Sequence, residues 1–109
     1  PGLCVLDYDL AERNSQHYVV LEINERSNAT RDQVIAALHA ENVLARKYFW
    51  PGCHDMKPYR DLFPHAGLML SGTRQVADRV IVLPTGTAIG VSDIASISSI
   101  IRLLAAASD

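Results

Sequence analysis

Alternation of apolar and polar side chains predicts two of the strands in this chain. Residues 17–24 place every second side chain, beginning at Val19, on one apolar face. Residues 45–50 alternate in the same way before a Pro-Gly pair, which stops a strand. One face of this second strand would carry Arg46, Tyr48 and Trp50. Residues 80–83 read Val-Ile-Val-Leu, which is typical of a strand covered on both faces and predicts a third strand.

Apolar residues at helical spacing predict helices around these strands. The first helix begins at Thr30, whose hydroxyl can cap it, and Gln33 can return the second bond of a capping box. This helix ends near residues 41–43. The last helix begins at Ser92-Asp93, which offers a capping hydroxyl and an acid in the first turn. The apolar stripe of the last helix consists of Ile94, Ile97, Ile101 and Leu104.

The order of the predicted elements indicates the fold class. Strand, helix, strand, short helices near residues 59–63 and 73–79, strand and helix follow one another along the chain. This order predicts an α/β (α+β) fold, in which helices pack on a small sheet of about three strands. At 109 residues the chain has the length of one domain. Residues 1–16 show no sustained period and are expected to be a lead-in, so the domain itself would occupy residues 17–109.

Composition and charge narrow the possible functions. The apolar fraction of 49% and the charged fraction of 20% are ordinary for a globular protein. The net charge of -2 provides no basic field of the kind that nucleic-acid binders use, so nucleic acid is not an expected partner. No apolar run has the length needed to cross a bilayer, so a membrane is not an expected partner either.

The cysteines and the first residues indicate the setting of the protein. Cys4 and Cys53 form neither a disulfide framework nor a CxxC pair, which favours a reduced, cytoplasmic protein. Cys53 and His54 are adjacent rather than at metal-ligand spacing, so no metal site is predicted. The first residues lack the basic region of a signal peptide. Because the sequence begins at Pro1 without an initiating Met, a missing upstream segment is expected.

The run Arg-Lys-Tyr-Phe-Trp-Pro-Gly-Cys-His at residues 46–54 is the strongest candidate for a binding surface. It holds three consecutive aromatic residues in a chain with only four Tyr, two Phe and one Trp. Such side chains stack, form hydrogen bonds and titrate. The alternative is a buried aromatic strand followed by a polar turn. Because aromatic residues build cores more often than sites, the residues alone favour this structural interpretation.

The residues alone predict no catalytic centre. Cys53 stands beside His54, but adjacent side chains rarely face each other, and no third group is placed to orient the imidazole. The glycines of residues 86–90 lack the lysine of a phosphate-binding loop and the dinucleotide fingerprint. We therefore predict no catalytic and no cofactor-binding residue in this chain.

Two neighbouring motifs resemble a known family. The sequence NVLARKYFWPGCH at residues 42–54, followed by MKPYR at residues 56–60, is similar to the C-terminal part of the DegT/DnrJ family of pyridoxal-phosphate-dependent nucleotide-sugar aminotransferases. The small domain of that family typically carries Arg-x-Tyr-[Phe/Tyr]-x-Pro-x-x-His and then a Pro-Tyr-Arg-like element. Residues 82–84 and the last helix resemble its closing elements, so the likeness covers about residues 17–109.

The resemblance implies a fold and a substrate-binding role for four residues. The fold would be that of the C-terminal domain of fold-type I pyridoxal-phosphate enzymes. Tyr48, Trp50 and His54 would lie at the edge of the active-site cleft, near the sugar nucleotide. Arg46 would hold this segment or meet the phosphate end of the ligand. Trp50 stands where the family often has Tyr or Phe, so stacking is retained while the hydrogen bond of a phenol is lost.

The resemblance also implies the reaction and the partners. An amino group would move from an amino acid, expected to be glutamate, to a nucleotide-linked keto sugar. Pyridoxal 5'-phosphate would be held by an upstream large domain, because neither Lys47 nor Lys57 has the context of a Schiff-base lysine. The chain alone would be inactive, and the intact enzyme would be a homodimer. A related sugar dehydratase and a free-standing α/β module that binds a ligand or a protein are the alternatives.

Overall fold

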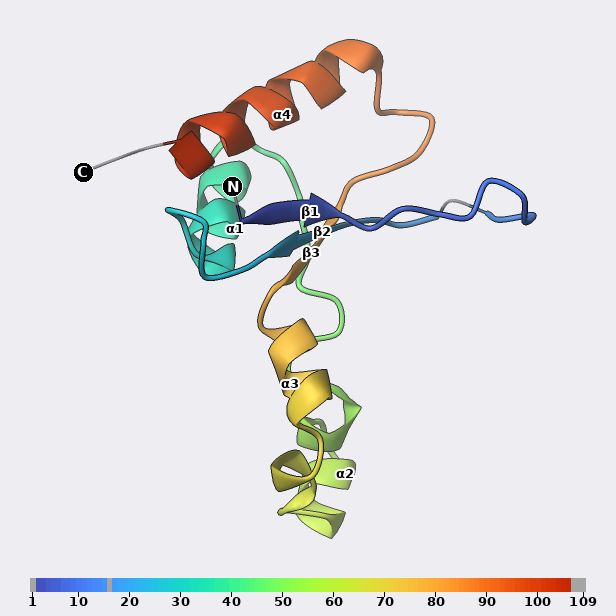
Figure 1. Cartoon of the computed structure of the whole chain (residues 1–109), viewed down its shortest axis with the longest axis vertical. Helices are drawn as coiled ribbons and strands as arrows, with labels where there is room; N and C mark the ends of the chain where they lie inside the picture. Colours follow the sequence, from blue (N-terminus) through green and yellow to red (C-terminus); the bar gives the residue numbers. More distant parts are fainter. Residues whose placement is uncertain (1, 16, 107–109) are drawn as a thin grey trace.

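The computed structural model describes residues 2–15 and 17–106 and contains three strands, four α-helices and two 3₁₀-helices within them (Figure 1). In chain order the elements are β1 (Leu3–Val5), β2 (Val19–Ile23), α1 (Arg31–Ala40), η1 (Cys53–Asp55), α2 (Tyr59–Leu62), η2 (Ala66–Leu68), α3 (Ser71–Ala77), β3 (Val80–Leu83) and α4 (Val91–Ala106). The predicted α+β class is confirmed. None of the described helices is both long and apolar enough to span a membrane.

The sheet has three antiparallel strands in the order β1-β2-β3. Leu21 at its centre lies opposite Val5 on one side and Ile81 on the other. The sequence pattern predicts β2 and β3 but no strand in residues 1–16. β1 has only three residues, and a segment this short shows no measurable period.

The strand predicted for residues 45–50 is wrong. Only Arg46 pairs with the sheet: its N–H donates to the Val82 carbonyl at 3.0 Å, and the Val82 N–H donates to the Arg46 carbonyl at 2.8 Å. The Trp50 N–H then donates to the Lys47 carbonyl at 2.7 Å, so the chain turns instead of extending. Turn hydrogen bonds replace the ladder, and the predicted shared face of Arg46, Tyr48 and Trp50 does not form.

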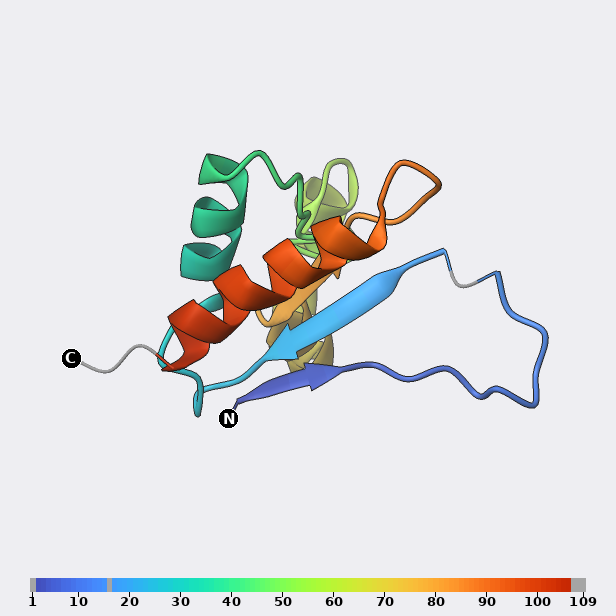
Figure 2. The ribbon, with the colours of Figure 1, turned by 90° about the horizontal axis from the view of Figure 1, so that it is seen from above.

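Helices α1 and α4 cover the same face of the sheet (Figure 2). The predicted capping box of α1 is confirmed, since Thr30 and Gln33 exchange both of its hydrogen bonds. One face of β2 and β3 packs against both helices in the core, whose buried residues are Leu21, Ile23, Ala29, Val34, Ile35, Leu38, Ala45, Ile81, Ile97 and Ile101. Ile94 was expected in the stripe of α4 but is 55% exposed, because the first turn of α4 extends beyond this core.

Residues 46–79 form an arm that extends away from the sheet and returns to it (Figure 1). The arm contains η1, α2, η2 and α3, and the short helices predicted near residues 59–63 and 73–79 correspond to α2 and α3. Of its residues, all of which the structure describes, only Gly52, His54 and Ala77 are buried. The remainder of the chain, residues 2–45 and 80–106 without residue 16, is called the body below.

Candidate functional site

The candidate site lies where the arm joins the sheet, at Arg46 and Tyr48. The pairing of Arg46 with Val82 fixes its backbone against the edge of β3. The Arg46 guanidinium carbon lies 5.9 Å from the centre of the Tyr48 ring, within the range of a cation–π contact. The structure therefore brings together two of the four residues that the sequence predicts for the site.

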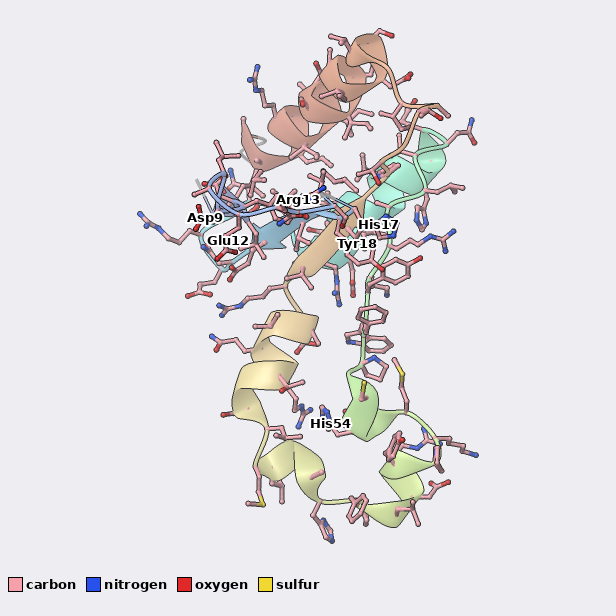
Figure 3. The ribbon with its side chains drawn as sticks, turned by 90° about the vertical axis from the view of Figure 1, so that its right-hand side faces the viewer. Asp9, Glu12, Arg13, His17, Tyr18 and His54 are labelled. Carbon is pink, nitrogen blue, oxygen red and sulfur yellow. The ribbon has the colours of Figure 1, made fainter. Side chains whose placement is uncertain are left out.

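The two residues before β2, His17 and Tyr18, also belong to this site. The rings of Tyr18 and Tyr48 meet edge to face at 6.0 Å, and the His17 ring lies 4.5 Å from that of Tyr18. Figure 3 shows His17 and Tyr18 together where the sheet meets the arm. Two side chains hold this backbone, since Thr85 Oγ1 donates to the His17 carbonyl at 2.9 Å and the Tyr8 hydroxyl donates to the Tyr18 carbonyl.

These residues line a pocket of about 300 Å³. Its full lining is His17, Tyr18, Leu44, Arg46, Tyr48, Val82, Leu83, Pro84 and Thr85. The guanidinium can form charge-assisted hydrogen bonds with an anion, and the tyrosine rings offer aromatic surface, of which the Tyr48 ring already stacks on Phe49 with ring centres 5.2 Å apart. The pocket therefore suits a ligand that combines negative charge with a flat ring or a sugar.

Sequence reasoning missed His17 and Tyr18, although the sequence contained a signal for them. The predicted strands at residues 17–24 and 80–83 can pair antiparallel, and their pairing places the first residues of one beside the last residues of the other. The structure pairs Val19 with Leu83, so the residues before Val19 lie next to those after Leu83. Arg46, paired with Val82, joins them from the outer edge of β3.

Trp50 is directed to a different contact. Its indole N–H donates to Asp78 Oδ1 at 3.1 Å, and the Lys47 ammonium lies 5.0 Å from the ring. Trp50 does not line the pocket of Arg46 and Tyr48. A substrate bound in that pocket would therefore not meet Trp50 through the pocket's lining.

His54 lies inside the arm rather than at the pocket (Figure 3). The sequence predicts a loop at residues 53–57, but Cys53–Asp55 form η1 and His54 is only 8% exposed. Neither ring nitrogen has a hydrogen-bond partner among the described residues. Asp55 Oδ2 lies 3.4 Å from Nε2, close enough to attract a protonated ring but not aligned for a hydrogen bond.

A glycine makes room for the His54 ring. Gly52 has a φ of 99°, which favours glycine, and a Cβ added there would lie 2.9 Å from His54 Cε1. On the side of Nε2, a Cβ added at Gly67 would lie 3.5 Å away, an ordinary contact distance. The backbone conformation at residue 52 and the imidazole packed against it therefore both require glycine at this position.

The described residues do not fit pyridoxal phosphate, the cofactor implied by the resemblance. Such a site requires a lysine for the Schiff base together with groups that hold the phosphate. Lys47 Nζ lies 3.8 Å from Asp32 Oδ1 and against Trp50, so its charge is already engaged. Lys57 is exposed on the arm. Neither lysine lines the pocket of Arg46 and Tyr48.

Comparison with known proteins identifies a family, and the relatives include an Escherichia coli enzyme and a solved structure. The sequence model of the DegT/DnrJ/EryC1/StrS aminotransferase family matches residues 2–102. The dTDP-4-amino-4,6-dideoxy-D-glucose transaminase of Escherichia coli is 31% identical over 87 residues, which are 80% of this chain and 24% of that protein. The crystal structure of DesI in the presence of its TDP-sugar product superposes with a TM-score of 0.84 and 46% identity, over 96% of this chain and 26% of DesI. The chain thus spans about a quarter of the length of each relative.

Proposed function

Because the chain belongs to the DegT/DnrJ/EryC1/StrS aminotransferase family, we propose that it is the C-terminal small domain of a pyridoxal-phosphate-dependent sugar aminotransferase. The whole enzyme would transfer an amino group from an amino acid, with glutamate as the expected donor, to a nucleotide-linked keto sugar. The observation that carries this proposal is the superposition with DesI, whose structure was determined with a TDP-sugar. The transaminase name of the Escherichia coli relative favours amino transfer over the related dehydration.

In this proposal the pocket at Arg46 and Tyr48 meets the sugar nucleotide. A nucleotide sugar carries a diphosphate, which a guanidinium binds through charge-assisted hydrogen bonds, and flat groups that stack on aromatic rings. Arg46 supplies the cation, while Tyr48 and Tyr18 supply the rings within one pocket of about 300 Å³. The substrate-binding role of His54 stays a prediction, whereas the bond of Trp50 to Asp78 points to an indirect role for that residue.

The remaining parts of the proposal concern what lies outside this chain. Pyridoxal 5'-phosphate would be held by a large domain upstream, since the described residues do not fit it. The intact enzyme would be a homodimer. A cytoplasmic setting is supported by the two unpaired cysteines, Cys4 and Cys53.

A domain exchange tests the proposal. This chain replaces the matching 26% of DesI, and the chimera is compared with the chain alone. We expect the chimera to show pyridoxal absorbance, to bind the TDP-sugar product of DesI and to transfer an amino group to a TDP-linked keto sugar. We expect the chain alone to show neither the absorbance nor the transfer. Activity of the chain alone, or a folded and cofactor-loaded chimera that binds no TDP-sugar, would overturn the proposal.

A pair of matched variants tests the pocket within the chimera. Arg46→Ala should weaken binding of the TDP-sugar by about tenfold or more, because a hydrogen bond to a charged group contributes about 1.5–3 kcal/mol. Arg26→Ala is the control, since Arg26 is exposed in the turn after β2 and does not line the pocket. If both variants weakened binding of the TDP-sugar equally, the loss would come from the lower positive charge of the protein and not from this pocket.

A further inference from the structure

The two limbs of the arm are joined to each other at its base. Trp50, on the outgoing limb, donates its indole N–H to Asp78 Oδ1 at 3.1 Å. Asp78 is the C-cap residue of α3, where the returning limb reaches the sheet. One side-chain hydrogen bond therefore links positions 28 residues apart, at the place where the arm leaves the body.

The returning limb is also joined to the body by Arg31. This arginine is only 6% exposed, and its Nη1 donates to the Ala77 carbonyl at 2.7 Å and to the Val80 carbonyl at 3.3 Å. Ala77 is the last residue of α3, so the cation lies at the negative end of that helix. The first residue of α1 thus fixes the end of α3 against the start of β3.

Lys47 and Asp32 connect these two ties. Asp32 Oδ1 accepts a bond from Arg31 Nε at 2.6 Å and lies 3.8 Å from Lys47 Nζ, and Lys47 covers the Trp50 ring at 5.0 Å. The contacts form a closed ring from α1 through the outgoing limb to α3 and back to α1. We call this ring the base clamp; its members are Arg31, Asp32, Lys47, Trp50 and Asp78.

We infer that Trp50 is a positioning residue, which holds the orientation of the arm through Asp78 and thereby the place of Tyr48 in the pocket. The arm buries only three of its own residues, so apolar packing does little to fix its orientation. The polar ties at its base, which also include the pair of Arg79 with Glu25 at 2.8 Å, decide it. Tyr48 lies two residues before Trp50, within the same turn. Trp50 acts on the ligand through Tyr48 and does not contact it. The inference rests on the proposed function only for its effect on substrate.

Amide hydrogen exchange on the full chain tests the clamp without any ligand. Asp78→Ala removes the acceptor, Asp78→Asn retains one, and Asp61→Ala is the control on an exposed acid of the arm. We expect Asp78→Ala to raise the exchange rate of amides in residues 51–76 about fivefold while amides of β2 and β3 stay unchanged. Asp78→Asn and Asp61→Ala should leave both regions unchanged. A uniform change in both regions, or none with Asp78→Ala, would overturn the inference.

Fluorescence provides a second readout, because Trp50 is the only tryptophan of the chain. The side chain of Trp50 is 47% exposed while its N–H is bonded to Asp78, so loss of this acceptor in Asp78→Ala should free the ring to move, change its emission spectrum and increase quenching by acrylamide. Asp78→Asn should restore the original spectrum. An emission spectrum that is the same in all three proteins would contradict an indole held by Asp78.

Kinetics in the DesI chimera separate positioning from direct contact. If Trp50 acts through the clamp, Asp78→Ala and Trp50→Phe should raise KM for the TDP-sugar by similar factors of about five, and Asp78→Asn should restore it. If Trp50 contacts the ligand, Trp50→Phe alone should raise KM, which would overturn the inference. An unmutated chimera that binds no TDP-sugar would defeat the proposed function alone, because the exchange and fluorescence results on the full chain would still decide the clamp.

Discussion

The body and the arm of this protein are held in different ways. In the body, one face of the sheet and two helices enclose a continuous apolar core, and Leu38 at its centre is 0% exposed. In the arm, only Gly52, His54 and Ala77 are buried. Large apolar side chains lie instead on the surface of the arm, among them Phe49, Tyr59, Leu62, Phe63, Leu68 and Met69.

This difference explains why the pocket lies at the junction of the two regions. Tyr18 comes from the body and is fixed by bonds to its backbone, whereas Tyr48 comes from the arm. A change in the orientation of the arm therefore changes the pocket while the core remains intact. The body half of the site is attached to a packed sheet, whereas we infer that a few polar contacts at the base of the arm hold the other half.

The largest effect is expected in the core. Leu38→Ala should lower the free energy of unfolding by about 3 kcal/mol, because it leaves a cavity among fully buried neighbours. Its matched control is Leu62→Ala on the arm, where the side chain is 64% exposed and the loss should stay below about 0.5 kcal/mol. Urea unfolding of both variants measures the difference. Equal losses would remove the distinction between the two regions.

The sequence predicts the body better than the arm for the same physical reason. A face that is buried against a core imposes a period on its sequence, and β2, α1 and α4 each show one, while β3 is buried on both faces and shows an unbroken apolar run instead. The arm buries almost nothing, so its sequence has no reason to alternate, and the apparent alternation at residues 45–50 was coincidental. β1 is the exception within the body, since three residues are too few to show a period.

The site was predictable only where neighbours in sequence are neighbours in space. Arg46 and Tyr48 are two residues apart, and the structure keeps them together. His17 and Tyr18 join them through the register of β2 against β3, which the prediction of the two strands alone does not fix. The burial of His54 depends on contacts with Gly52, and the bond of Trp50 depends on Asp78, neither of which has a pattern in the sequence.

The next largest effect on the free energy of unfolding is expected at Arg31, which joins the body to the arm. Arg31→Ala should lower the free energy of unfolding by about 2 kcal/mol, because it leaves the Ala77 and Val80 carbonyls without their buried donor. Arg79→Ala is the comparison, since Arg79 also joins the arm to the body, through a pair with Glu25 near the surface at 2.8 Å, and such pairs contribute about 0–1 kcal/mol. Urea unfolding gives both values. An Arg31 variant no weaker than the Arg79 variant would show that the buried tie does not stabilise the junction.

A smaller effect on the free energy of unfolding, confined to the body, is expected from the loss of the Thr30 cap. Thr30→Ala removes the capping hydroxyl of α1 and should lower the free energy of unfolding by about 1 kcal/mol. Thr30→Ser retains the hydroxyl and should recover most of this loss. Hydrogen exchange should increase in α1 and not in α3, which would sharpen the boundary between body and arm. An increase of the same size in both helices would mean that they open together.

The smallest effect on stability, and the sharpest test of function, is expected at His54. Its ring is buried, and neither nitrogen has a hydrogen-bond partner in the described part of the chain, so His54→Leu removes an unsatisfied polar group while filling much of the same space. Urea unfolding should therefore change by less than about 0.5 kcal/mol, in contrast to Leu38→Ala. In the DesI chimera, a substrate-binding His54 would make the same variant lose sugar-nucleotide turnover while retaining pyridoxal absorbance. Unchanged turnover would instead show that the imidazole only packs within the arm. If leucine can replace His54 without loss of stability or of turnover, the side chain provides neither hydrogen bonds nor charge to the ligand.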